Sequence, residues 1–360
     1  MSVSLLPVPK VVITGGLGGL GTTLALALRV ENVPVTVIDA LHPGCAPYPV
    51  FENRKAVLED AGVEVRLQDM RLPDLPAEVL VPADRYESPL PPLWLHCAFP
   101  PPPDVPDVPL ESYQQMAYDA PAQWIDYAME RGWWWMVMQH LPAVLSDDAR
   151  LHYASWGTIF AAESKLRREF FRDVMRKQQM GLFPFLPELF GHHQSPHTMP
   201  LRQYLQILAG RDVSVCAFDK PWSVSSLDST ARDLLQVLQS YAASQGIEIE
   251  QKPNTNPDLL ARGEDWILHL RVLLQLSHLR VKSDQSPGSY YPTDAIGQRL
   301  AQLPEFQETG FAILAAEEVR RVSLDDVRNL IAGWGELPWM PPPDWPRQVS
   351  GGRGRRKRKS

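Results

Sequence analysis

Along the first 140 residues, the pattern of apolar and polar positions alternates between one typical of strands and one typical of helices. Short runs rich in apolar or β-branched residues predict strands, and the bulky run 133–138 predicts a buried one. An Ala/Leu-rich stretch after the first run and the segment 110–131 show helical spacing, with Gly132 as the expected end and Pro121 as the expected kink or restart. The strands are expected at 11–14, 33–38, 63–67, 93–98 and 133–138. Alternating strands and helices predict an α/β fold, a Rossmann-like doubly wound parallel sheet with a smaller C-terminal substrate-lobe region.

The second half of the chain is less regular, and it sets the expected domain organisation. Residues 1–240 are predicted to form the Rossmann-like dinucleotide-binding domain, 241–340 a smaller lobe, and 341–360 a Pro-rich linker with a basic disordered tail. The Pro-rich segment 100–109 is expected to be a surface loop. Further helices are expected at 161–178, 201–209, 229–243 and 323–331.

Composition narrows the class of protein. The chain is 44% hydrophobic and 21% charged, which is typical of a soluble globular protein. It contains no apolar run long enough to cross a bilayer and no signal peptide, so no membrane association is expected. Its three cysteines form no CxxC pair, which indicates a reducing compartment and a cytoplasmic location.

Charge is concentrated at one end of the chain. Six of the 35 basic residues lie in the last ten positions, so the remainder carries a net charge of −13 rather than −7. An acidic body repels nucleic acid, but the tail at 351–360 is able to contact it or to act as a nuclear targeting signal. A disordered solubilising end is the alternative interpretation of the same residues.

A glycine-rich turn after the first strand predicts a nucleotide site. Gly15, Gly18 and Gly21 have the spacing that lets a backbone turn tightly, approach a pyrophosphate and pack a helix against a strand. Asp39 ends the second strand, where a carboxylate suits the ribose hydroxyls of NAD and repels the extra phosphate of NADP. The alternative is a glycine-rich turn that binds nothing.

Several segments in order resemble the extended short-chain dehydrogenase/reductases, the group of NAD-dependent epimerases and dehydratases. The resemblance implies that Thr14 and the three glycines hold the dinucleotide, that Asp69 contacts the adenine, and that Lys165 is a catalytic residue that also holds the nicotinamide ribose. It also implies a homodimer through helices 110–131 and 161–178. The matching segments are Thr14–Gly21 (TGGxGxxG), Asp69, Leu95–Ala98 (HxAA), Ser164–Leu166 with Glu169 (sKxxxE), and Leu227–Asp228 with Ala231 (VxDxA).

The chain departs from that pattern where proton transfer takes place. The family's tyrosine lies four residues before its lysine, but Ala161 stands there, and alanine cannot transfer a proton. The fifth strand ends in Gln139-His140 rather than in serines. Tyr153, His140 and His152 are the nearby groups that could supply protons instead.

These observations predict an NAD-binding protein that has lost standard catalysis and serves as a structural, regulatory or interaction subunit. Two alternatives stay open. One is an active epimerase, dehydratase or oxidoreductase on a nucleotide sugar with relocated acid/base groups, and the other is a nucleic-acid-associated protein that uses its tail. No metal is expected, because the histidines at 192, 193 and 197 lack an accompanying Cys or acid. The run Trp133–Trp135 is expected to pack in the core rather than to form a stacking platform.

Overall fold

The structure is a computed structural model of the 360-residue chain. The residues it describes are 8–40, 48–75, 88, 90–99, 110–140, 157–177, 181–186, 188–190, 213–216, 221–222, 224–244, 261–262 and 281–284.

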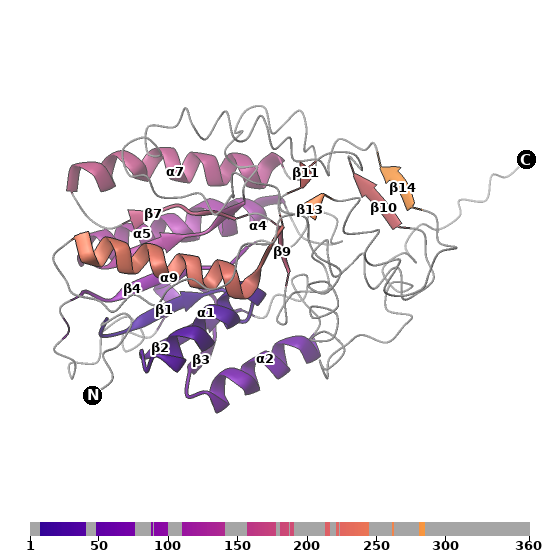
Figure 1. The fold of residues 1–360 in the computed structure, drawn as a ribbon. Coiled ribbons are helices and arrows are strands. Elements are labelled where there is room, and N and C mark those ends of the chain that lie inside the picture. The colour runs from indigo at the N-terminus through magenta and orange to yellow at the C-terminus, as the bar shows by residue number, and fades with distance from the viewer. Residues whose placement is uncertain are drawn as a thin grey trace, which may run out of the picture.

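A six-stranded parallel sheet forms the centre of the described part of the molecule (Figure 1). The strand order is β3-β2-β1-β4-β5-β7, in which β1 lies in the middle and the order reverses beside it. This is the doubly wound arrangement, so the predicted fold class is confirmed. The strands are β1 (Val11–Thr14), β2 (Val35–Asp39), β3 (Glu64–Leu67), β4 (Leu93–His96), β5 (Trp134–Val137) and β7 (Gly181–Leu182).

Helices cover both faces of the sheet. On one face α1 (Gly19–Val30) packs beside α9 (Leu227–Ser244). The other face carries α4 (Leu110–Gln114), the π-helical turn η2 (Gln115–Asp119), α5 (Ala120–Glu130) and α7 (Gly157–Lys177). A further helix, α2 (Tyr48–Asp60), packs near β3, at the side of the sheet far from α7 (Figure 1). The sequence analysis did not anticipate α2.

The tryptophan run divides between the two faces, as the prediction of core packing requires. Trp134 meets Tyr241 of α9 edge to face, with ring centroids 5.2 Å apart. Trp135 points the other way into the cluster formed with α5 and α7, and it is fully buried. A Cβ on Gly181 would lie 2.2 Å from the Trp135 ring, so β7 approaches β5 closely only because that residue is glycine.

The predicted disturbance at Pro121 is present one turn earlier than expected. Proline has no backbone N–H, so the carbonyl four residues before it loses its helical donor. The chain responds with η2, a π-helical turn that ends at Asp119, and α5 then begins at Ala120. Gly132 follows the helix with φ +68°, a backbone conformation that suits glycine.

Short strands extend the carboxyl edge of the sheet. β6 (Gln139–His140) continues directly from β5 and pairs in parallel with β8 (Phe185–Leu186). β9 (Glu188–Phe190) pairs with β12 (Val224–Ser226), which leads into α9. The remaining elements are η1 (Leu72–Asp74), β10 (Val213–Cys216), β11 (Pro221–Trp222), β13 (Ala261–Arg262) and β14 (Val281–Asp284).

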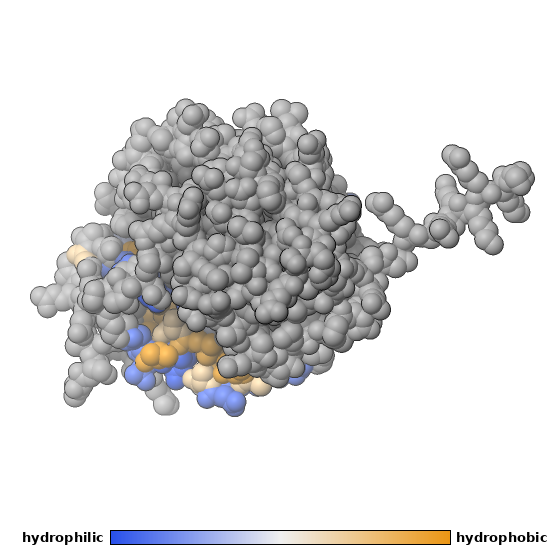
Figure 2. Space-filling view, turned by 45° about the vertical axis from the view of Figure 1, so that its right-hand side comes forward, coloured by the Kyte–Doolittle hydropathy of each residue, from blue (hydrophilic) through white to orange (hydrophobic). Residues whose placement is uncertain are grey.

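The described surface is mixed in character. Figure 2 shows hydrophobic residues beside hydrophilic ones along the lower part of the view. Among the described residues, the large hydrophobic side chains that are exposed are Val30 and Leu67. No helix in the described ranges combines the length and the apolar character that a membrane span needs.

Several predictions fall on residues outside this description. These are the helices at 201–209 and 323–331, the Pro-rich segment 100–109, most of the lobe at 241–340, and the tail at 341–360. The predicted domain boundary at residue 240 falls inside α9, which runs from Leu227 to Ser244.

Candidate dinucleotide site and acid/base groups

The glycine turn between β1 and α1 is folded tightly against its neighbours. Gly15 has φ +73°, and a Cβ there would lie 2.3 Å from the Cα of Ala98, just beyond β4. A Cβ on Gly21 would lie 2.5 Å from the carbonyl oxygen of Gly15. The loop therefore takes this shape only with glycine at both positions, one for the turn and one for the close approach of the helix.

Gly18 differs from these two glycines. It is the N-cap of α1, no side chain caps the helix there, and Thr22 N–H donates to its carbonyl at 2.9 Å. As at the start of any α-helix, the N–H groups of the first turn of α1 have no partner within the helix. A Cβ on Gly18 would meet only the Gly15 carbonyl closely, at 3.1 Å. This opening at a helix N-terminus suits a phosphate group, which accepts such N–H donors.

Asp39 lies at the carboxyl end of β2 beside the same loop. Its Oδ2 accepts a hydrogen bond from the Leu17 N–H at 3.0 Å. Arg54, on α2, donates from Nη1 to the Leu17 carbonyl at 2.6 Å. The two charged side chains therefore hold both polar groups of one loop residue.

Arg54 is almost completely buried, which is unusual for a guanidinium group. Burial lowers its pKa to about 10, and the nearby Asp39 carboxylate opposes that change. The sequence analysis missed this residue, because nothing local distinguishes it from an exposed basic residue of an amphipathic helix.

Thr14, which was expected to contact the dinucleotide, uses its hydroxyl within the sheet. Its Oγ1 accepts a hydrogen bond from Trp94 Nε1 at 3.1 Å and lies 2.8 Å from His96 Nδ1. His96 is paired with Thr14 across β1 and β4, and burial lowers the pKa of its imidazole to about 3. The hydroxyl can donate its own proton to Nδ1, which places the remaining ring proton on Nε2.

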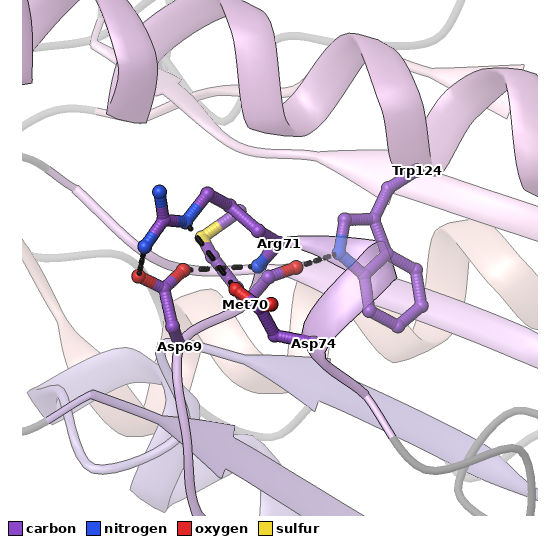
Figure 3. Close-up of polar contacts among 5 residues, drawn as sticks. All are labelled: Asp69, Met70, Arg71, Asp74 and Trp124. Atoms are coloured by element: carbon purple, nitrogen blue, oxygen red, sulfur yellow. Dashed lines mark hydrogen bonds and ion pairs between the residues drawn. The ribbon is translucent and has the colours of Figure 1, made fainter.

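Asp69 lies on the turn after β3, where Figure 3 shows its contacts. Its Oδ1 accepts from the Arg71 N–H at 3.0 Å, and its Oδ2 lies 2.8 Å from Arg71 Nη2. The hydrogen bond to Asp69 and its charge raise the pKa of Arg71. Trp124 Nε1 donates to the Met70 carbonyl at 2.6 Å and so anchors the turn to α5. The structure thus places Asp69 on an anchored, exposed turn at the carboxyl edge of the sheet.

Lys165 lies on an exposed position of α7. Its Nζ is 4.0 Å from the centre of the Tyr118 ring, and the Tyr118 hydroxyl donates to Glu169. Burial, together with that hydrogen bond to a carboxylate, raises the pKa of Tyr118 to about 12. The structure therefore brings Lys165 together with residues of η2 and α7, and not with the end of β5.

A different residue of α7 meets the end of β5. Glu163 is buried, and its two carboxylate oxygens contact the His140 backbone N–H at 2.9 Å and His140 Nδ1 at 2.6 Å. Residues two apart on a helix point in nearly opposite directions, so Glu163 faces the sheet where Lys165 faces outward. The sequence analysis named His140 but missed Glu163.

The other candidates for proton transfer and metal binding lie outside the described residues. They are Tyr153 and His152, and the histidines at 192, 193 and 197. Within the described part of the chain, no group of three His, Cys, Asp or Glu side chains is arranged to hold a metal ion.

Comparison with known proteins finds no match to a family model and none to a curated protein. Solved structures match over most of their length. UDP-glucuronic acid 4-epimerase from Bacillus cereus, in complex with UDP-glucuronic acid and NAD, is 14% identical with a TM-score of 0.61, covering 90% of this chain and 98% of that one. The dTDP-glucose 4,6-dehydratase DesIV from Streptomyces venezuelae, with NAD and TYD bound, is 14% identical with a TM-score of 0.62, covering 91% and 97%.

A third match widens the range of reactions carried by this architecture. The ADP-L-glycero-D-manno-heptose-6-epimerase of Helicobacter pylori is 12% identical with a TM-score of 0.60, covering 94% of this chain and 99% of that one. All three are epimerases or dehydratases by name. The strand order, the glycine turn and these similarities agree, and the chain has the fold of the extended short-chain dehydrogenase/reductases.

Proposed function

We propose that this chain binds NAD beside its glycine turn and has lost the tyrosine-dependent chemistry typical of the fold. The observation that carries the proposal is the pairing of Asp39 with the Leu17 N–H, which places a carboxylate against the loop that would hold the pyrophosphate. In doubly wound sheets, ligands bind outside the carboxyl ends of the strands where the strand order reverses. The loop after β1 lies at that point, between β1 and β4.

The residues present fit a dinucleotide. Side chains at Gly15 and Gly21 would collide with backbone, and the opening at Gly18 leaves helix N–H groups for the phosphates. Asp39 would hold the adenosine ribose hydroxyls, Asp69 the adenine, and Lys165 remains a proposed ligand for the nicotinamide ribose. NAD, when bound, supplies a hydride acceptor or, in its reduced form, a hydride donor.

The charge arrangement favours NAD over NADP. The Asp39 carboxylate would repel a 2′-phosphate on the adenosine ribose. Arg54 carries the nearby positive charge, but it is 1% exposed and its guanidinium is bonded to the Leu17 carbonyl. A buried guanidinium that is already bonded to the backbone offers no surface for a phosphate.

The loss of standard catalysis rests on position 161. Ala161 lies on α7, four residues before Lys165, and has no group that exchanges a proton. A nucleotide-binding subunit with a structural, regulatory or interaction role is one consequence. Relocated acid/base chemistry on a nucleotide sugar, the substrate class named for the similar structures, is the second, and the contact between His140 and Glu163 favours it.

Calorimetric titration with NAD and with NADP tests the binding part of the proposal. We expect NAD to bind and NADP to bind at least about tenfold more weakly, equivalent to roughly 1.4 kcal/mol. Equal affinity for the two dinucleotides would remove the role assigned to Asp39, and absence of NAD binding would overturn the proposal itself.

A further inference from the structure

The contact between His140 and Glu163 joins two elements at the carboxyl edge of the sheet. His140 belongs to β6, directly after β5, and Glu163 belongs to α7. One Glu163 oxygen accepts the His140 backbone N–H at 2.9 Å, and the other lies 2.6 Å from Nδ1 of the ring. The Gln139 side chain adds a bond from Nε2 to the Glu163 carbonyl at 2.8 Å. The carboxylate is thereby fixed in position relative to the imidazole.

This geometry sets the chemistry of the ring. A carboxylate at Nδ1 holds a proton on that nitrogen, so the lone pair of the neutral ring is on Nε2. The same negative charge stabilises the imidazolium that forms when Nε2 takes up a proton. A carboxylate that orients an imidazole in this way is the arrangement by which histidine acts as a general base in hydrolases of unrelated fold.

Two phenylalanine rings pack near the imidazole, which remains partly exposed. The Phe99 ring centre is 4.4 Å from that of His140, and the Phe160 centre is 5.6 Å away. The His140 side chain is 21% exposed, whereas that of Glu163 is 5% exposed. The imidazole is therefore accessible to a small group, while the carboxylate behind it is shielded from water.

The ring also lies close to the proposed dinucleotide site. Gly15 is packed against the backbone of Ala98, and Phe99 is the next residue along the chain. Phe99 in turn contacts His140, so two contacts joined by the Ala98–Phe99 peptide bond lead from the glycine turn to the imidazole. Since β4 and β5 are neighbours in the sheet, both groups lie at its carboxyl edge, where ligands bind in sheets of this kind.

Two buried polar atoms next to this pair have unused hydrogen-bonding capacity. Gln139 Oε1 and Ser164 Oγ have no hydrogen-bond partner among the residues that the structure describes. Both residues are fully buried, and each is adjacent in sequence to a member of the pair. Buried unsatisfied atoms are few in folded proteins, and each one calls for an explanation, of which a role in a functional site is one.

We propose that His140, held by Glu163, is a proton-transfer site for hydride transfer between NAD and a hydroxyl-bearing carbon of a nucleoside-diphosphate sugar. The inference rests on the proposed NAD binding and assigns to His140 the role that Ala161 cannot perform. In the oxidative direction Nε2 of neutral His140 removes the hydroxyl proton, while the C–H bond breaks and its hydride passes to oxidised nicotinamide. The products are a ketone, reduced nicotinamide and the His140 imidazolium, and the reverse step returns both proton and hydride.

His140 is then a catalytic residue and Glu163 a positioning residue. The test uses the full chain with the variants His140→Gln and Glu163→Gln. Glu130→Gln is the control, because Glu130 is exposed at the end of α5 and its carboxylate contacts Arg131 on the surface at 3.6 Å. Circular dichroism and thermal unfolding establish that each variant is folded, and calorimetry with NAD establishes that each still binds the dinucleotide.

A readout independent of turnover is nuclear magnetic resonance of the full chain with labelled histidine. The His140 signal is identified by its absence from His140→Gln. We expect the ring nitrogens to report the Nδ1–H tautomer in the wild-type protein and a mixture of tautomers in Glu163→Gln. We also expect addition of NAD to shift the His140 signal, since the nicotinamide would lie against the ring.

Turnover is measured with NAD and each of three probes: UDP-glucose, UDP-glucuronic acid and dTDP-glucose. Reduced nicotinamide is followed by its absorbance, and epimerised or dehydrated products by chromatography. We expect the wild-type protein and Glu130→Gln to convert at least one probe. His140→Gln should lower kcat by about 10²–10⁴-fold, the usual contribution of a general acid/base. Glu163→Gln should lower kcat with little change in KM.

The outcomes separate this inference from the proposed function. Absence of NAD binding to the wild-type protein overturns both. Normal NAD binding with no shift of the His140 signal, no conversion of any probe, or equal conversion by wild type and His140→Gln overturns only the assignment of His140. If Glu163→Gln does not fold, the His140→Gln variant and the resonances of the wild-type protein still test the inference.

Discussion

Arg54 donates a hydrogen bond of 2.6 Å to the backbone carbonyl of Leu17, across 37 positions of sequence. The opposite polar group of Leu17, its N–H, donates to Asp39 at 3.0 Å. Leu17, which lies between Gly15-Gly16 and Gly18-Gly19, is therefore held at both its backbone N–H and its carbonyl, and its side chain is fully buried. The glycine turn is held in shape by the protein before any ligand is bound.

Replacing Arg54 should loosen this turn. Arg54→Met would leave the Leu17 carbonyl without its donor and Asp39 without its buried counter-charge. We expect the free energy of unfolding to fall by about 1–3 kcal/mol, the range for a buried polar group left without its hydrogen-bond partner. Urea denaturation measures this change, and calorimetry should show weaker NAD binding at a temperature where the variant is folded.

Lys55→Met provides the comparison for Arg54→Met. Lys55 is the next residue of α2, and its ammonium forms a surface contact with Glu59 at 3.8 Å. Such pairs contribute about 0–1 kcal/mol, so this variant should resemble the wild-type protein in both stability and NAD affinity. Equal effects of the two substitutions would show that α2 tolerates no change, and would remove the specific role of Arg54.

Substitutions at two glycines of the turn should separate the effect on NAD binding from the effect on stability. Gly21→Ala would bring a Cβ within 2.5 Å of the Gly15 carbonyl oxygen, and overpacking of this kind typically costs about 1–3 kcal/mol. Gly18→Ala brings its closest contact to only 3.1 Å, so we expect a smaller loss of stability.

The methyl group added by Gly18→Ala would nevertheless occupy the approach to the helix N-terminus, and NAD affinity should fall by roughly tenfold or more. Thermal unfolding and calorimetry on both variants decide the matter, and a Gly18→Ala protein that binds NAD normally would contradict the assigned phosphate position.

Asp39→Asn should reduce the preference of the protein for NAD over NADP. The amide oxygen of the introduced asparagine can still accept the Leu17 N–H, so the turn keeps its shape. Removing the negative charge weakens the bonds to the ribose hydroxyls and relieves the repulsion of a 2′-phosphate. We expect the affinity for NAD to fall about tenfold and that for NADP to stay level or rise, roughly a 1.4 kcal/mol change in selectivity. An unchanged ratio of the two dissociation constants would count against this role of the carboxylate.

His96 should make the protein sensitive to acid. Burial lowers the pKa of its imidazole to about 3, whereas a histidine in the unfolded chain titrates near 6.5. Between these values the unfolded chain binds one more proton than the folded protein, so the free energy of unfolding falls as pH decreases. The contribution of this residue is about 1.4 kcal/mol per pH unit below pH 6.5.

His96→Asn tests that dependence. The introduced amide oxygen can accept the Thr14 hydroxyl proton that Nδ1 accepts in the wild-type protein, at 2.8 Å. Urea unfolding between pH 7 and pH 4 should give a shallower pH dependence for the variant than for wild type, by about one proton. Parallel curves for the two proteins would contradict the assignment of a neutral, buried imidazole.

Much of the architecture was predictable because it depends on local pattern. The runs at β1, β4 and β5 are mostly apolar and buried, whereas β3 alternates charged and apolar residues. β2 begins directly after Pro34, which cannot donate to the ladder. The helix α2 was missed because its apolar positions do not form a clear helical stripe. Pro121 correctly indicated a break, but the π-helical turn that accommodates it could be located only in the folded helix.

The residues of the candidate site also divide into those that local sequence identifies and those that it does not. The glycine spacing and Asp39 lie within one strand, turn and strand, so local sequence identifies them. His140 could be named as a titratable group but not placed. Arg54 and Glu163 gave no local signal, because their significance comes from partners 37 and 23 positions away.

The sequence by itself determined the strands of the sheet in chain order up to β5, the glycine turn after β1, the carboxylate at the end of β2 and the absence of a tyrosine at position 161. These follow from residue types whose backbone preferences and chemistry act over a few positions. Only the tertiary structure decided which face of α7 meets the sheet, and hence that Glu163 rather than Lys165 reaches the end of β5. That choice depends on how the whole helix packs its apolar side chains against the sheet, and no short segment contains that information.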